Sequence, residues 1–231
     1  MGIYTTTATS QADYKNRRTK DEKDEKIVGN YLDTYFYPTF ATTITRNTDK
    51  ETQINGLDVT VGDKDWTITI DEKAATRWAG RNLQTFAHEI SSVNKLGKEY
   101  DGWLLDFNSS SDYFVEVWID ELGTSSNTIT SAEDIKDATM CLIKKSDLWS
   151  YLKNNNVKSS ELKEIGDRMR MCGDSVTYYK GFKVICNQSF QEKPINILIS
   201  RNTLINTIST YSVQIKNGKT TTLRKSSTIW K

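Results

Sequence analysis

Apolar and polar residues alternate along several parts of the chain, most regularly over residues 66–73. The sequence Trp-Thr-Ile-Thr-Ile-Asp-Glu-Lys repeats with a period of two, which predicts a β-strand with one apolar face. Because side chains two positions apart share a face, Asp71 and Lys73 should point the same way. Glu72 should then point to the opposite face, together with the isoleucines.

A second strand is predicted just before this one, over residues 57–61, after the turn signal Asn-Gly at 55–56. The polar residues 62–65 can connect the two strands as a hairpin. In such a hairpin, Asp58 at the start of the first strand would lie near Asp71 at the end of the second. The pattern therefore predicts two neighbouring carboxylates with a lysine beside them.

The rest of the pattern predicts further helices and strands. Dense charge over residues 11–26, followed by apolar residues at helical spacing, predicts an N-terminal helix over about 11–37 that Pro38 ends. Further strands are expected at 40–45, 83–93, 101–106, 113–119, 138–143, 176–186 (a hairpin), 195–199 and 211–223 (a hairpin with an Asn-Gly turn). Further helices are expected at 146–152, 161–171 and 202–207, capped by Ser146, by Ser159 or Ser160, and by Asn202.

These elements predict an α/β (α+β) fold with a mixed central β-sheet flanked by helices. The chain has no internal repeat, no Pro/Gly-rich linker and only 2 prolines. We therefore expect a single domain over residues 1–231, with a core of about 40–120 after the N-terminal helix and strands and helices from there to 231.

Composition narrows the class of protein. Hydrophobic residues make up 36% and charged residues 26% of the chain, and no apolar run is long enough to span a membrane. Residues 1–11 lack the layout of a secretory signal. The three cysteines, Cys141, Cys172 and Cys186, have no metal-binding spacing and are expected to be reduced core thiols. We therefore expect a cytoplasmic protein, and its 1 histidine excludes a histidine-rich zinc site.

Charge is balanced over the whole chain and uneven along it. The net charge of +1 gives no general basic surface for nucleic acid. Residues 212–231 nevertheless contain only basic charges. These cations are Lys216, Lys219, Arg224, Lys225 and Lys231. Either this hairpin is ordinary solvated surface, or its first four cations contact nucleic-acid phosphates.

Two acids and a lysine in this arrangement suit phosphodiester chemistry. Mg²⁺ prefers hard oxygen ligands and often takes only one or two protein carboxylates. Asp58 and Asp71 would hold such an ion, which can orient and acidify a water molecule. Lys73 could position or deprotonate that water, or neutralise charge that develops on the phosphate.

The same residues resemble the D…(D/E)xK signature of the PD-(D/E)xK, or restriction-endonuclease-like, nuclease superfamily. Leu57 stands where the name-giving motif has proline. The similarity extends over about residues 47–92 to uncharacterised bacterial and phage members of that superfamily. Its matching positions are Asp49-Lys50, Gln53, Gly56-Leu57-Asp58-Val59, Ile70-Asp71-Glu72-Lys73-Ala74 and Thr85-Phe86-Ala87-His88-Glu89-Ile90.

The resemblance implies a Mg²⁺-dependent (or Mn²⁺-dependent) endonuclease that hydrolyses DNA, related to restriction or phage functions. It implies catalytic roles for Asp58, Asp71 and Lys73, with Asp58 and Asp71 as metal ligands. Glu89, Gln53 and Asp49 are candidate auxiliary residues. Two further acids from the leading helix, Glu25 and Asp33, could add a ligand, and His88 could contact phosphate or water or simply pack. A homodimer would suit cleavage of two strands by one site per chain.

Two other interpretations stay open at this point. The chain could be a non-catalytic nucleic-acid-binding or interaction protein with a nuclease-like fold. Loss of turnover usually removes an acid or the lysine, whereas this chain has all three, which favours an enzyme. Alternatively, residues 71–73 could be only the polar end of a strand, because short motifs often match by chance.

Overall fold

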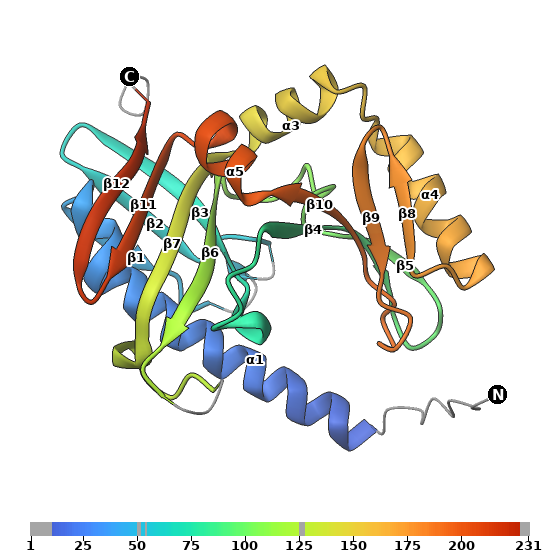
Figure 1. Ribbon diagram of the computed structural model, residues 1–231, viewed down its shortest axis with the longest axis horizontal. Helices are drawn as coiled ribbons and strands as arrows, with labels where there is room; N and C mark the ends of the chain where they lie inside the picture. Colours follow the sequence, from blue (N-terminus) through green and yellow to red (C-terminus); the bar gives the residue numbers. More distant parts are fainter. Residues whose placement is uncertain (1–10, 50–51, 54, 125–127, 227–231) are drawn as a thin grey trace. The chain divides into compact units, whose positions relative to one another are not determined.

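The computed structural model describes residues 11–49, 52–53, 55–124 and 128–226, and these contain two β-sheets (Figure 1). The larger sheet is mixed: β3 and β6 run parallel, and its other neighbouring strands are antiparallel. Its seven strands, in spatial order, are β1 (Thr43–Arg46), β2 (Val59–Asp63), β3 (Trp66–Ala74), β6 (Tyr113–Leu122), β7 (Ile135–Lys144), β11 (Tyr211–Lys216) and β12 (Lys219–Lys225).

The second sheet has five strands, and its pairs β4–β5, β9–β10 and β8–β9 are antiparallel. In spatial order they are β5 (Glu99–Asp101), β4 (Thr85–Val93), β10 (Ile195–Ser200), β9 (Phe182–Cys186) and β8 (Val176–Tyr179). The α+β class and the mixed sheet that the sequence predicted are confirmed. The second sheet was not foreseen, because alternation predicts a strand without saying which sheet it joins.

The chain divides into two compact units. One comprises the residues up to Glu22, Ala87–Phe107 and Asn155–Leu198; the other comprises Lys23–Phe86, Asn108–Asn154 and the residues from Ile199. The seven-stranded sheet lies in the second unit, which we call the large unit. Whether the chain folds as a single domain with a catalytic core near residues 40–120 depends on whether the two units fold independently. The single domain therefore stays a prediction.

Helices vary in length and type. They are α1 (Gln11–Tyr31), the π-helix η1 (Leu32–Phe36), the 3₁₀-helices η2 (Tyr37–Thr39), η3 (Thr76–Trp78) and η4 (Ala132–Asp134), α3 (Lys145–Asn154), α4 (Ser159–Cys172), α5 (Arg201–Thr203) and the π-helix η5 (Leu204–Ile208). No helix of the described segments is long and apolar enough to cross a membrane.

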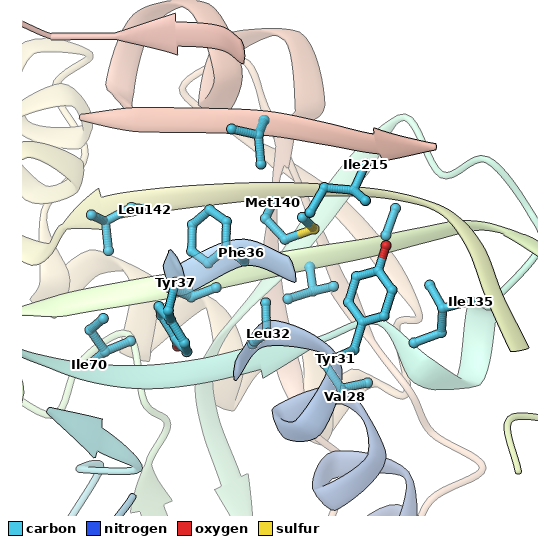
Figure 2. Packing of buried hydrophobic residues seen from close by; sticks show 14 of the residues in the cluster. Val28, Tyr31, Leu32, Phe36, Tyr37, Ile70, Ile135, Met140, Leu142 and Ile215 are labelled. Carbon is cyan, nitrogen blue, oxygen red and sulfur yellow. The ribbon is translucent and has the colours of Figure 1, made fainter. Parts of the chain in front are cut away.

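One face of the seven-stranded sheet carries the main apolar core of the large unit. The end of α1, together with η1 and η2, packs its buried side chains onto this face (Figure 2). The labelled contacts come from Val28, Tyr31, Leu32, Phe36 and Tyr37 on the helical side and from Ile70, Ile135, Met140, Leu142 and Ile215 on the sheet side. Ile70 belongs to this covered face, so its neighbours Asp71 and Lys73 have different surroundings from Glu72.

Several predicted boundaries differ from the structure. The N-terminal α-helix ends at Tyr31, and the chain reaches Pro38 through a π-turn and a 3₁₀-turn that bury Leu32 and Phe36 fully. The strand expected at 101–106 is wrong, because β5 ends at Asp101 and tight turns follow.

Three expected helix caps and one expected core thiol are also wrong. Ser146 is the second residue of α3, which begins at Lys145. Ser200 caps α5, where its hydroxyl accepts from the Thr203 amide, so the expected cap at Asn202 lies inside the helix. Lys158 precedes α4, which places Ser159 within that helix. All three cysteines are free thiols, but Cys172 is exposed in the last turn of α4.

Candidate active site

The β2–β3 hairpin places the two predicted aspartates at one end. Val59 pairs with Ile70 and Asp63 pairs with Trp66, so only the two residues Lys64-Asp65 form the turn. The hairpin is confirmed, with a turn two residues shorter than the segment expected from sequence. Close pairing leaves the residue before β2 beside the end of β3.

Alternation along β3 separates its three charged residues as predicted. Lys73 Nζ lies 2.6 Å from Asp71 Oδ1, and the Asp71 side chain is only 4% exposed. Glu72 points to the opposite face, where Arg46 donates to its carboxylate at 2.8 and 2.9 Å and the Tyr37 hydroxyl donates at 2.6 Å. Arg46 and Tyr37 are therefore the partners of Glu72 behind the sheet.

Asp58 is held against the backbone of β3. Its amide donates to the Ile70 carbonyl at 3.0 Å, and its Oδ2 accepts from the Glu72 amide at 2.7 Å. That amide lies between Asp71 and Lys73 in sequence, so the Asp58 carboxyl is fixed next to both. The neighbouring carboxylates predicted from sequence are confirmed.

The electrostatics of the site act most strongly on Asp58. Burial, and then the negative charge of Asp71, raise the pKa of Asp58 to about 7, against the lowering effects of the Glu72 amide and of Lys73. Burial contributes more to that shift than the repulsion between the two carboxylates.

Lys73 is a cation at neutral pH. Burial alone would lower its pKa, but the charge of Asp71 and its hydrogen bond outweigh burial, Asp58 adds to them, and the pKa of Lys73 is raised overall. A lysine in this state can donate hydrogen bonds and neutralise negative charge. It is poorly suited to remove a proton from water.

The auxiliary candidates Asp49 and Gln53 support the loop before β2. Asp49 Oδ2 accepts from the Thr52 amide at 2.8 Å and from its hydroxyl at 2.6 Å, and the Gln53 amide group donates to the Asn47 carbonyl at 2.8 Å. Asn47 in turn donates its amide to the Asp58 carbonyl. These contacts position Asp58, and a metal-binding role of Asp49 or Gln53 stays a prediction.

Glu89 and His88 lie on β4, in the five-stranded sheet and outside the large unit. Gly102 packs against the Glu89 backbone and side chain, and Leu104 donates its amide to the Glu89 carbonyl at 3.0 Å. His88 is fully buried with its ring 5.1 Å from that of Trp103, which fits the packing interpretation. The auxiliary role of Glu89 stays a prediction.

The two helix acids differ in their surroundings. Asp33 accepts from Arg46 at 2.7 and 2.9 Å, on the same side of the sheet as Glu72. Glu25 is exposed, and its charge contributes to the raised pKa of Lys73. Asp33 therefore serves the ion-pair network behind the sheet, and Glu25 acts on the lysine of the site.

The C-terminal basic hairpin is the predicted β11–β12 pair around Asn217-Gly218. Lys216 is already ion-paired with Asp137 at 3.2 Å and lies 3.9 Å from Glu121, while Arg224 donates to the Asn206 carbonyl. Lys219 and Lys225 are exposed, and Lys231 lies outside the described residues. A nucleic-acid-binding role of this hairpin stays a prediction.

The sequence pattern did not predict a group of polar residues beside Asp71. Lys145 Nζ donates to Ser109 Oγ and to Ser111 Oγ, both at 2.7 Å. Ser109 Oγ and Asp71 Oδ2 lie 2.6 and 3.2 Å from the point where a Cβ on Gly56 would stand. No local spacing marks these residues, because they come from separate parts of the chain that only the folded sheet brings together.

No protein-family model matches the chain, and neither the curated proteins nor the solved structures include a significant match. Within the described segments no group of three or more His, Cys, Asp or Glu side chains is arranged to hold a metal ion. The site thus consists of two carboxyls, Asp58 and Asp71, with Lys73 ion-paired to one of them. It belongs to the class of closely spaced acidic pairs accompanied by a cation.

Proposed function

We propose that the protein is a metal-dependent phosphodiesterase, namely a Mg²⁺- or Mn²⁺-dependent endonuclease that hydrolyses DNA. One observation carries this proposal: Asp58 is half-buried next to Asp71, and its pKa is raised to about 7. Lys73 balances only one of the two charges, so holding both groups as carboxylates is costly. A divalent ion between them would remove that cost, so the site favours metal binding.

The residues present fit a hard divalent ion. Asp58 and Asp71 would be its protein ligands, which matches the one or two carboxylates that Mg²⁺ usually takes. A bound ion would supply an acidified water and a positive charge for the phosphate. The protonated Lys73 would stabilise negative charge on the reacting phosphate, beside Asp71.

We further propose a restriction-endonuclease-like core. The helix α1 precedes a mixed sheet, and the motif residues lie at the end of two adjacent strands of that sheet. The choice of DNA comes from the resemblance of residues 47–92 to that nuclease superfamily. A homodimer is part of the same proposal.

A second candidate is a non-catalytic nucleic-acid-binding protein with the same fold. The 2.6 Å ion pair between Lys73 and Asp71 favours it, because the lysine already balances one carboxylate without a metal. The two candidates differ in turnover. Only the enzyme converts substrate, and only the enzyme needs Lys73 for a step after binding.

The test is incubation of the protein with supercoiled, linear, branched and single-stranded DNA in Mg²⁺, Mn²⁺ or EDTA. We expect metal-dependent cleavage that Lys73→Ala abolishes while DNA affinity is kept. Lys64→Ala is the matched control, because Lys64 is exposed in the turn of the same hairpin. DNA binding without cleavage under all conditions would favour the non-catalytic candidate.

Metal binding is tested separately by calorimetry with Mg²⁺ and Mn²⁺. Asp58→Ala should weaken metal affinity strongly, whereas Asp65→Ala, an exposed acid in the hairpin turn, should not. Unchanged affinity in Asp58→Ala would remove Asp58 from the site.

A further inference from the structure

Lys145, Ser109 and Ser111 form a cluster of hydrogen-bond donors in the large unit. The lysine begins α3, immediately after β7, and the two serines belong to the loop before β6. Its ammonium donates to both serine oxygens at 2.7 Å and lies 4.5 Å from the centre of the Phe114 ring. These contacts hold the ammonium in a fixed position between two hydroxyl groups and an aromatic ring.

The serine hydroxyls are themselves suited to donate. Because each serine oxygen accepts from Lys145, its hydrogen points elsewhere. Among the described residues, Ser109 can donate to the Asn55 carbonyl at 3.3 Å or to Ser111 Oγ at 3.4 Å. Both distances exceed the usual 2.5–3.0 Å of a hydroxyl hydrogen bond. An added acceptor could therefore gain better hydrogen bonds from these hydroxyls than the protein provides.

Two independent observations place this cluster beside Asp71. Phe114, whose ring contacts the ammonium, is the direct neighbour of Asp71 on the parallel strand β6. Gly56 brings Ser109 Oγ and Asp71 Oδ2 close to a single point, where a side chain would collide with the serine. Lys73 binds the other oxygen of Asp71, Oδ1. Lys73 thus contacts one oxygen of the Asp71 carboxylate, and Ser109 lies near the other.

We propose that Lys145, Ser109 and Ser111 form a phosphate-binding subsite that holds a phosphate of the substrate strand next to Asp71. A cation flanked by two hydroxyl donors suits the tetrahedral oxygens of phosphate. The identity of that phosphate as part of a nucleic-acid strand rests on the proposed function. The subsite itself is a claim about anion binding.

The first experiment uses inorganic phosphate as the probe, in EDTA at fixed ionic strength, so that neither metal nor cleavage contributes. Calorimetry should show phosphate binding by the parent protein that falls at least about tenfold in Lys145→Met, equivalent to roughly 1.4 kcal/mol. Lys144→Met is the matched control, because Lys144 is the exposed preceding residue, and its phosphate affinity should equal that of the parent.

A double variant, Ser109→Ala with Ser111→Ala, keeps the lysine and removes the hydroxyls. It should also lose phosphate affinity, and its unfolding transition and that of Lys145→Met should stay within a few degrees of the parent. If Lys145→Met does not fold, this variant and Lys145→Arg carry the test. The arginine retains the charge without the paired contacts to both serines, so it should bind phosphate more weakly than the parent.

Failure of the subsite and failure of the nuclease proposal give different results. A parent that cleaves DNA while Lys145→Met binds phosphate and DNA unchanged overturns the subsite alone. If the parent cleaves no DNA, and phosphate binding by the parent is lost in Lys145→Met, the subsite is supported and the nuclease proposal is overturned. A parent that binds no phosphate in EDTA overturns the subsite directly.

Discussion

At the scale of single residues, the raised pKa of Asp58 makes the stability of the fold depend on pH. Its folded-state pKa of about 7 lies above the ordinary value of 3.8, so the folded protein holds a proton that the unfolded chain releases. In the metal-free protein, the free energy of unfolding should therefore decrease as pH rises from about 4 to 7 through this group. Above pH 7, the ionised Asp58 lowers the free energy of unfolding.

Replacing Asp58 by asparagine removes this titration. In EDTA at pH 8, Asp58→Asn should be more stable than the parent by about 2 kcal/mol, less than the roughly 4 kcal/mol of the full shift because the group is partly exposed. Near pH 4 the difference should vanish. Urea unfolding at both pH values checks this, and a difference that does not depend on pH would contradict the raised pKa.

Replacing Glu72 should destabilise the protein, in contrast to the replacement of Asp58. Its partners Arg46 and Tyr37 are behind the sheet, so Glu72→Gln should lower the free energy of unfolding by roughly 1–3 kcal/mol by weakening a partly buried ion pair. DNA cleavage should stay within about threefold of the parent, because no interaction with the reacting groups is lost. Unfolding and cleavage assays on this variant and on Glu121→Gln, an exposed strand acid, separate the effects.

The side on which each of these residues lies could be read from the sequence, because period-two alternation determines faces along one strand. The partners of these residues could not be read from the sequence. Arg46, Ser109 and Lys145 come from other strands and loops, and their contacts depend on which strands become neighbours. The parallel pairing of β3 with β6, which no alternation encodes, brings Phe114 and hence Lys145 to Asp71.

At the scale of elements, the conformation of the loop before β2 requires a glycine at position 56. Its φ of +70° and the nearby Ser109 and Asp71 side chains both exclude a Cβ. Gly56→Ala should cost about 1–2 kcal/mol of stability and lower affinity for Mg²⁺ or Mn²⁺ roughly tenfold by displacing Asp71.

Gly218→Ala is the matched control for this loop. Gly218 has a φ of +73°, but no heavy atom lies within 4 Å of the added Cβ. It should therefore lose similar stability and keep its metal affinity. Calorimetry with both variants distinguishes contact with the site from backbone strain, and equal metal affinities would refute the close approach at Gly56.

The basic hairpin β11–β12 gives a second element prediction. Lys219 and Lys225 are exposed, whereas Lys216 is engaged with Asp137. If the hairpin contacts DNA, replacing Lys219 and Lys225 by serine should reduce the slope of log affinity against log salt by about 0.9 per neutralised phosphate. Lys216→Ser should change it less. Anisotropy titrations across salt concentrations test this, and an unchanged slope in the double variant would mark the hairpin as solvated surface.

At the scale of the whole molecule, hairpins were predictable and sheets were not. The turns at Lys180-Gly181 and Asn217-Gly218 use positive φ angles that such residues tolerate, so local sequence revealed them. The division of strands between two sheets depends on pairings such as β4 with β10, which lie far apart in sequence. Motif spacing therefore predicted correctly that Asp58, Asp71 and Lys73 lie close together, while the matched segment at Glu89 belongs to the other sheet.

The proposed dimer also belongs to this scale, because each chain supplies one set of Asp58, Asp71 and Lys73. If the protein is the proposed nuclease, a single set cuts one strand, so a monomer should release nicked circles from supercoiled DNA before linear DNA appears. A cooperating dimer should produce linear DNA directly, at a rate that rises with the square of protein concentration below the dissociation constant. Mixing the parent with excess Asp71→Asn protein should then suppress linear product more than nicked product. Equal suppression of both products, together with first-order dependence on protein, would show that each chain acts alone.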